Sequence, residues 1–178
     1  MRKLNIRICS AMLVLLLAHC ALSAFMLSGI SRIHFRLLNW LLAGFASIHV
    51  AIGLSVCVRS VRNAIRTGRW DIRENWRHWA QIASGLGIVA LLPFHISAFT
   101  VSSGGKHFLR EFSLLGLALQ ALFATAVYVH VLLGIDPLSV ACGWLDFRPA
   151  RTICKTVCTC LYLLALASLI IYHRMWTR

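Results

Sequence analysis

Five long apolar runs limit how this chain can fold. They cover about residues 8–27, 37–58, 79–101, 112–135 and 156–172. An α-helix rises ~1.5 Å per residue, so about 20 apolar residues cross a hydrocarbon core ~30 Å thick. The chain is 60% hydrophobic and has only 5 acidic residues among 178, a composition typical of integral membrane proteins. The sequence therefore predicts an all-α integral membrane protein, a five-transmembrane-helix bundle forming a single membrane domain over residues 1–178.

The basic residues between these runs predict the orientation of the bundle. Lys and Arg are enriched in cytoplasmic loops. Twelve of the 18 Lys and Arg lie on one predicted side, in the amino terminus, the loop between the second and third spans and the loop between the fourth and fifth spans. Six of these twelve lie from Arg59 to Arg77. We therefore expect the N-terminus in the cytoplasm, the C-terminus outside and the tail from His173 to Arg178 as an interface anchor. Anionic lipid and topology explain the net charge of +13, so no nucleic-acid partner is expected.

The first run has a second interpretation, a secretory signal peptide. Basic residues precede the run, and Ala21-Leu22-Ser23-Ala24 resembles a cleavage site. Its length of about 20 residues instead favours a retained span. So does His19, which would be unusual in the apolar core of a signal peptide.

The seven cysteines predict neither a disulfide framework nor a metal site. All except Cys20 lie at predicted cytoplasmic helix ends, where thiols stay reduced. The run Cys154-x3-Cys158-x-Cys160 has no fourth ligand close in sequence. The chain contains no Cys-x-x-Cys-His motif, so a covalently attached c-type haem is excluded.

Four histidines lie inside the apolar runs, at His19, His49, His95 and His130. An ionisable side chain at membrane depth is costly and by default indicates a functional site. Helical rise places His49 ~13 Å and His130 ~8 Å from the cytoplasmic ends of their spans. It places His19 ~13 Å and His95 ~8 Å from the outer ends. We therefore expect an inner pair, His49 with His130, and an outer pair, His19 with His95.

Two imidazoles at one depth on different helices suit either ligation of a planar cofactor or hydrogen bonding to neighbouring groups. Ligation of haem iron by two histidines needs small residues where the ring passes. Small residues lie near these histidines on three spans: Gly44, Ser47, Gly53, Ser84, Gly85, Gly87 and Ala126. Small residues also mediate plain helix packing, so structural histidines remain an alternative. The other four histidines, His34, His78, His107 and His173, lie at span ends or in loops, where solvated or head-group roles fit. His78 and His107 could also approach a haem propionate or a quinone.

One segment carries a family resemblance. It runs from His49 through the basic residues to Trp79-Ala80-Gln81-Ile82-Ala83-Ser84-Gly85 and on to His95. Weaker matches are Val129-His130 with Gly134, Gly143-Trp144-Leu145-Asp146 and Ala18-His19. In these residues the chain resembles the di-haem cytochrome b membrane subunit of fumarate reductases and succinate:quinone oxidoreductases, the type built from one five-helix polypeptide.

The resemblance implies two haem b (heme b) groups and a role in electron transport. The implied iron ligands are His49 and His130 at the inner haem and His19 and His95 at the outer haem. Further cofactor-binding residues implied beside the inner haem are Trp79, Gln81 and Ser84. No catalytic residue is implied. Two departures from the family are Tyr128, where some members carry a carboxylate, and the loop 28–36, which has no acid.

The family resemblance also implies partners and a location. The chain would be a multi-pass anchor in a bacterial cytoplasmic membrane. It would carry electrons between menaquinone or another quinone and a cytoplasmic iron-sulfur and flavoprotein dehydrogenase. The basic residues from Arg59 to Arg77 would dock the iron-sulfur subunit, although membrane topology alone also explains them. Whether the subunit itself reacts with quinone or is non-catalytic stays open.

Two other functions stay open at the level of sequence. One is a different b-type redox protein, such as a quinone or ferric reductase subunit without an attached dehydrogenase. A co-purifying iron-sulfur protein would argue against it. The other is a haem-free membrane scaffold or assembly protein with structural histidines, which would purify colourless.

The charge distribution predicts the outcome of reporter fusions. Alkaline phosphatase, which folds only outside the cytoplasm, should be active when fused after Arg110 or Arg178 and inactive when fused after Arg73. A fluorescent protein that matures only in the cytoplasm should give the opposite pattern. Activity of the phosphatase at Arg73 would reverse the predicted orientation.

Overall fold

The computed structural model describes residues 2–31, 35–99, 101–103, 106–108, 113–143 and 148–176. Its five helices are α1 (Arg2–Leu27), α2 (Arg36–Thr67), α3 (Trp76–Phe99), α4 (Leu114–Ala141) and α5 (Arg148–Trp176). Each helix contains a stretch long and apolar enough to cross a membrane. The prediction of an all-α bundle with five helices that could span a membrane is thereby confirmed, while the orientation of its termini stays a prediction.

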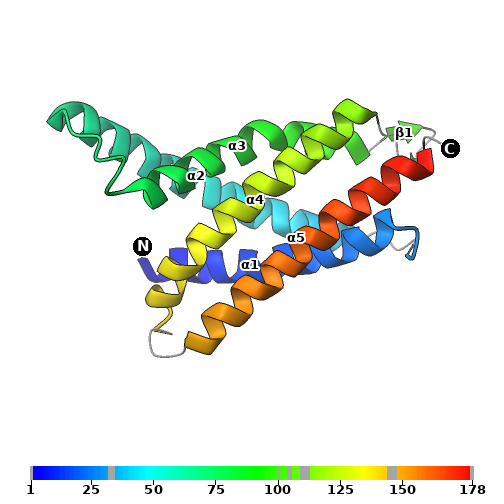
Figure 1. The fold of residues 1–178 in the computed structure, drawn as a ribbon, viewed down its shortest axis with the longest axis horizontal. Coiled ribbons are helices and arrows are strands. Elements are labelled where there is room, and N and C mark those ends of the chain that lie inside the picture. The colour runs from blue at the N-terminus through cyan, green and yellow to red at the C-terminus, as the bar shows by residue number, and fades with distance from the viewer. Residues whose placement is uncertain are drawn as a thin grey trace.

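The helices run alternately in opposite directions (Figure 1). The N-terminus and the turn between α2 and α3 lie toward one end, and the C-terminus and the α3–α4 connection lie at the other. The principal packed pairs are α3 with α4, α4 with α5, α1 with α5 and α1 with α2. Because α2 contacts α3 at few positions, α2 packs on the bundle chiefly through α1.

The polar link predicted between the third and fourth spans contains a short hairpin. Strands β1 (Val101–Ser103) and β2 (Lys106–Phe108) pair antiparallel, with Ser102 opposite His107. Strands of three residues are too short to show an alternation of apolar and polar side chains, so the sequence does not indicate this hairpin. Gly104 and Gly105, which separate the two strands in sequence, lie outside the described residues.

The helices extend well beyond the apolar runs. Helix α2 continues to Thr67, and Gly68, with φ of 65°, ends it in the left-handed conformation that glycine adopts readily. The expected loop over 59–77 is confirmed only for residues 68–75, because Arg59, Arg62 and Arg66 lie on α2 and Arg77 on α3. Hydropathy identifies only the part of a helix that lies in hydrocarbon. The helix can continue beyond it, because arginine side chains on the continuing part place their charged groups in water.

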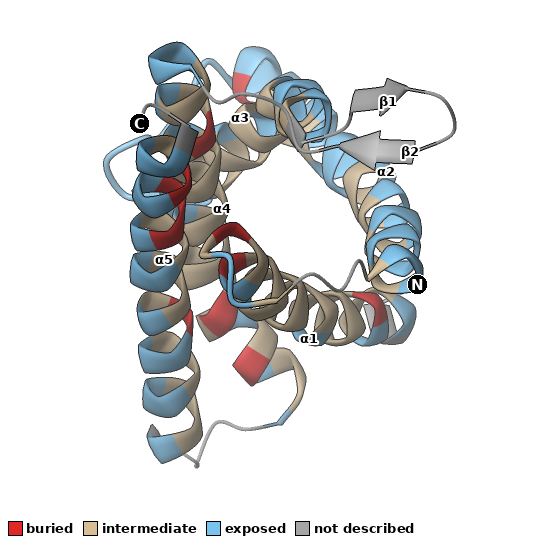
Figure 2. Cartoon of the chain, turned by 90° about the vertical axis from the view of Figure 1, so that its right-hand side faces the viewer, coloured by how far each residue is buried: buried red, intermediate tan, exposed pale blue. Residues whose placement is uncertain are grey.

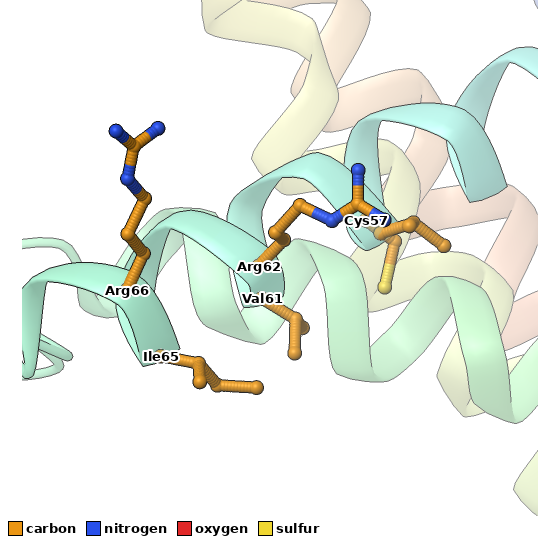
Figure 3. A pocket seen from close by; sticks show the side chains of 6 residues that line it. Cys57, Val61, Arg62, Ile65 and Arg66 are labelled. Atoms are coloured by element: carbon orange, nitrogen blue, oxygen red, sulfur yellow. The ribbon is translucent and has the colours of Figure 1, made fainter.

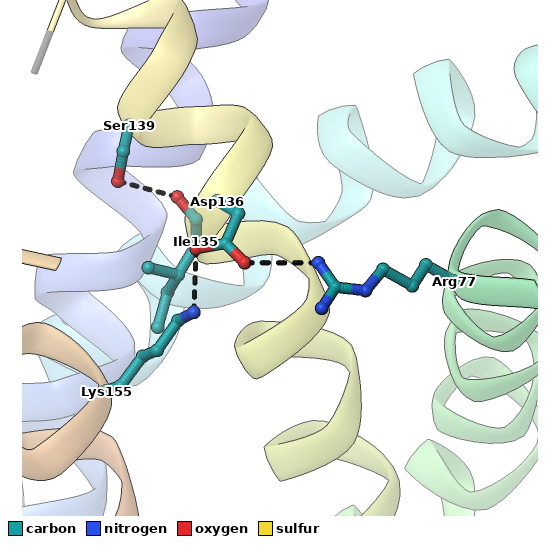
Figure 4. A network of polar contacts seen from close by, with 5 residues as sticks. All are labelled: Arg77, Ile135, Asp136, Ser139 and Lys155. Carbon is teal, nitrogen blue, oxygen red and sulfur yellow. Dashed lines mark hydrogen bonds and ion pairs between the residues drawn. The ribbon is translucent and has the colours of Figure 1, made fainter. Parts of the chain in front are cut away.

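Helix α4 continues past the end of its apolar run at about residue 135 and through a proline, a residue that ordinarily ends or kinks a helix. Pro137 lies inside the helix, which reaches Ala141. Polar contacts surround it: Asp136 accepts from Lys155 of α5 at 2.7 Å and pairs with Arg77 of α3 at 3.5 Å (Figure 4). The Ser139 hydroxyl also donates to the Ile135 carbonyl at 2.7 Å. Neighbouring helices and serine hydroxyls commonly make an internal proline tolerable in membrane helices.

Aromatic and hydroxyl contacts join α4 to α5. The rings of Tyr128 and Tyr162 stack with centroids 4.3 Å apart and planes 7° from parallel. The Tyr128 hydroxyl lies 3.1 Å from the Thr159 hydroxyl, and the Tyr162 hydroxyl lies 3.0 Å from that of Thr125. Tyr128, the residue at which the chain departs from the resembled family, thus packs on α5.

Few side chains are fully buried, and most of them lie on α1, α4 and α5 (Figure 2). One cluster joins Leu27 of α1 to Leu169 and Tyr172 of α5, with Ala98 and Leu117 packed against it. Many large apolar side chains are exposed, as expected for a bundle whose outer surface contacts lipid.

Leu169→Ala should lower stability because it leaves a cavity in this cluster. Leucine-to-alanine substitutions in packed cores cost ~2–5 kcal/mol, and in a bilayer we expect about 2 kcal/mol because the transfer of leucine from lipid contributes little. The matched control is Leu163→Ala on the same helix, where the side chain is 58% exposed. Thermal unfolding in detergent should separate the two variants, and equal melting temperatures would contradict the packing shown here.

Candidate functional site

The structure brings together the two histidine pairs expected from their depths. In the outer pair, the rings of His19 on α1 and His95 on α3 lie with centroids 6.2 Å apart and planes at 71°. In the inner pair, His49 on α2 and His130 on α4 lie with centroids 6.0 Å apart and planes at 79°. The four histidines therefore form two separate sites, each built from helices that are not consecutive in the chain.

The spacing within each pair equals that of two imidazoles on one metal ion and also lies within the range of about 4.5–7 Å for ordinary edge-to-face ring pairs. Metal–nitrogen bonds of ~2 Å on opposite sides of a metal hold the two ring centroids ~6 Å apart. Both pairs have this spacing. The rings can rotate about their metal–nitrogen bonds, so this arrangement tolerates the large angle between their planes.

Hydrogen bonds fix the tautomer of His95. The side-chain amide of Gln120, which is 3% exposed, donates through Nε2 to the Phe94 carbonyl at 3.2 Å. Because a carbonyl only accepts, this contact turns Oε1 of Gln120 toward His95 Nδ1, 2.8 Å away. Nδ1 of His95 is therefore the protonated nitrogen, and the lone pair of the ring lies on Nε2.

Two more contacts hold the outer pair. Nδ1 of His19 lies 2.9 Å from Oδ1 of Asn39 on α2. The His95 ring stacks on Phe123, with centroids 4.5 Å apart and planes 19° from parallel. Both imidazoles of the outer pair are thus held by a side-chain amide at Nδ1, the usual arrangement for histidines that bind metal through Nε2.

The inner pair has a similar arrangement with different groups. Nδ1 of His130 donates to the Gln81 carbonyl at 3.0 Å and lies 3.3 Å from the Ser84 hydroxyl. The carbonyl again places the proton on Nδ1. Nδ1 of His49 lies 3.5 Å from Cys9 Sγ. Because Cys9 donates its own S–H to Asn5 Oδ1 at 3.7 Å, its sulfur is left to accept from His49.

The contacts also give the distance between the two sites. Each of the helices α1 to α4 carries one histidine of the inner or outer pair. Ten or eleven residues away, the same helix carries a side chain that contacts a histidine of the other pair. These combinations are Cys9 and His19, Asn39 and His49, Ser84 and His95, and Gln120 and His130. Ten residues of helix rise ~15 Å, so the inner and outer pairs lie ~15 Å apart along the bundle.

The residues of the Trp79 to Ser84 motif divide between the inner pair and the turn before α3. Gln81 and Ser84 contact His130, as described above. Trp79 does not: its indole donates to the Trp70 carbonyl at 2.9 Å and its ring lies near Trp70. His78 is close to the Ser60 hydroxyl of α2, at 3.1 Å, and so joins the ends of α2 and α3.

Sequence reasoning missed Cys9, Asn39 and Gln120 as partners of the histidines. A signal for them was present. Asn39 and Gln120 are amides within apolar stretches, and all three lie ten residues from a histidine on the same helix, about three turns away.

Each histidine pair supplies two imidazole donors. A bare zinc or copper site needs three or four protein donors. Among the described residues, no group of three or more His, Cys, Asp and Glu is close enough to hold a metal ion. Two imidazoles per site instead fit a metal whose remaining ligands come from a macrocycle, as in haem.

Comparison with known proteins does not assign the chain to a family. No family model, curated protein or solved structure matches it.

Proposed function

We propose that this protein is a di-haem b membrane-anchor subunit that carries electrons across a bacterial cytoplasmic membrane. The observation that carries the proposal is the spacing of two histidine pairs, 6.2 Å and 6.0 Å between centroids, with a hydrogen-bond partner at Nδ1 of all four rings. His19 and His95 would ligate the outer haem iron, and His49 and His130 the inner one. Bound haem would supply an iron that accepts and releases one electron at a time.

The residues of the chain would control this chemistry in three ways. The histidines would hold the two irons at levels ~15 Å apart, half the thickness of a ~30 Å hydrocarbon core. The partners at Nδ1 would orient each imidazole and raise its basicity. The apolar spans around the sites would exclude water, which together with the axial ligands sets the reduction potentials.

The proposed docking surface for the electron-transfer partner lies at the end of the bundle nearer the inner pair. There α2 and α3 project beyond the other helices (Figure 1). A shallow, open depression of about 470 Å³ lies along α2, where Arg62 and Arg66 point away from Val61 and Ile65 (Figure 3). Its lining residues are Cys57, Val58, Val61, Arg62, Ile65 and Arg66. We propose that the iron-sulfur subunit of a fumarate reductase or succinate dehydrogenase type complex docks here and connects to a flavoprotein, with a quinone as the second redox partner.

Haem content tests the proposal directly. Protein purified in mild detergent from haem-replete cells should contain two b haems per chain, measured by the pyridine haemochrome method and by reduced-minus-oxidised spectra. His95→Ala should remove one haem and His49→Ala the other, because each substitution deletes an axial ligand. His78→Ala is the matched control and should retain both haems, since His78 contacts Ser60 and not a histidine pair.

The possible results separate the functions. A colourless parent protein would overturn the redox function and favour a scaffold with structural histidines. Two haems in a preparation that never co-purifies with an iron-sulfur protein would instead favour a quinone or ferric reductase subunit.

The glycine beside the inner pair gives a second test. A Cβ atom at Gly85 would lie 3.1 Å from Cε1 and 3.3 Å from Nδ1 of His130, closer than ordinary contacts. At Gly87, two residues further along α3, a Cβ atom would meet only the Ala126 Cβ at an ordinary 3.9 Å.

Gly85→Ala should therefore displace His130 and reduce occupancy of the inner haem, whereas Gly87→Ala should leave both haems bound. We expect the loss to be ~10-fold or more in haem affinity, as for other changes beside a metal ligand. Visible spectra and haem per chain measure it. Equal haem content in the two alanine variants would show that the close approach of Gly85 to His130 is not needed.

A further inference from the structure

Two pairs of helices, α1 with α2 and α3 with α4, are joined by polar contacts in both directions, because each helix of a pair contacts the histidine of the other. Asn39 of α2 contacts His19 of α1, and Cys9 of α1 contacts His49 of α2. In the same way Gln120 of α4 contacts His95 of α3, and Ser84 of α3 contacts His130 of α4. Each histidine is therefore held by a helix that supplies a ligand to the other site.

From this exchange we propose that Asn39 and Gln120 are positioning residues of the outer haem site. Each would hold the ligand histidine of a neighbouring helix in the tautomer that binds iron through Nε2. The inference rests on the proposed function and adds to it two residues on helices that carry only inner-site histidines.

Gln120 has the stronger geometric argument. Its amide spans two groups of α3, since Nε2 donates to the Phe94 carbonyl and Oε1 accepts from His95. It thereby fixes the position of the backbone before the ligand together with the orientation of the ring. Reversing the amide would place Oε1 against the Phe94 carbonyl, and because two acceptors cannot hydrogen-bond, the Phe94 contact fixes the orientation of the amide.

Asn39 has the same function at a less buried position. It lies near the start of α2, with an exposed side chain whose Oδ1 is 2.9 Å from His19 Nδ1. A polar amide within a membrane span is costly unless it has a hydrogen-bond partner. The contact with His19 supplies that partner, and the exposed location means that replacing Asn39 leaves the packing of the bundle largely unchanged.

The inference predicts effects that cross between helices. Removing an acceptor at Nδ1 lowers the basicity of the ligand, so the ferric haem is held less tightly and its midpoint potential rises. Asn39→Leu and Gln120→Leu should therefore weaken the outer haem by ~10–100-fold, the usual effect of losing such a partner. The inner haem should be unchanged, although both residues lie on the helices that carry His49 and His130.

The experiment uses the full-length, haem-loaded protein in detergent. We would measure the rate of haem transfer to excess apomyoglobin and the two midpoint potentials by redox titration. The redox transition that is absent from the His95→Ala variant identifies the outer haem. Ser55→Ala on α2 and Thr125→Val on α4 are matched controls, because their hydroxyls contact their own helix backbone or Tyr162 and not a histidine.

The expected result is faster transfer and a raised potential for the outer haem alone in both leucine variants, with neither change in the controls. Loss of the inner haem instead would mean that the substitutions disturb their own helices, and would overturn the inference. Unchanged transfer and potentials in a two-haem protein would also overturn it, while leaving the proposed function intact. If Gln120→Leu does not fold, Asn39→Leu at its exposed position decides the question. A colourless parent would instead reject the proposed function itself.

Discussion

The hydrogen bond at Nδ1 of each membrane-embedded histidine is the interaction on which the rest of this structure depends. In a bilayer no water is available to satisfy an imidazole, so another helix must provide the partner. The Gln81 carbonyl does so for His130 and the Gln120 amide for His95. These contacts determine which nitrogen keeps its lone pair and how the helices that carry the histidines must lie.

The same requirement explains how the bundle is assembled. Helices packing in lipid gain little from apolar burial, so polar contacts and close packing must select their neighbours. The reciprocal contacts join α1 to α2 and α3 to α4, each at two levels. Between α4 and α5 the stacked Tyr128 and Tyr162 and the ion pair of Asp136 with Lys155 have a similar role. Four helices thus form the sites, and α5 packs against α1 and α4.

Much of the fold follows from the sequence because hydrocarbon imposes a simple rule. Runs of about 20 apolar residues must be helices, so five spans could be counted and the depths of their histidines compared. The ends of the helices could not be read in this way. Beyond Val58 the sequence becomes basic while α2 continues to Thr67. Pro137 lies within α4, although proline ordinarily ends or kinks a helix. Hydropathy does not report a helix that continues in water or past a proline supported by its neighbours.

The sequence by itself determined the membrane class, the number of spans and the two depths at which histidines occur. Tertiary structure decided which side chains complete the sites. Cys9, Asn39 and Gln120 lie on different helices from the rings that they contact, and Trp79 turns away to the Trp70 carbonyl. Depth along a span follows from the rise per residue, which is the same for every helix. The partner of a side chain depends on the rotation of each helix and on its neighbours, which only the packing of all five spans fixes.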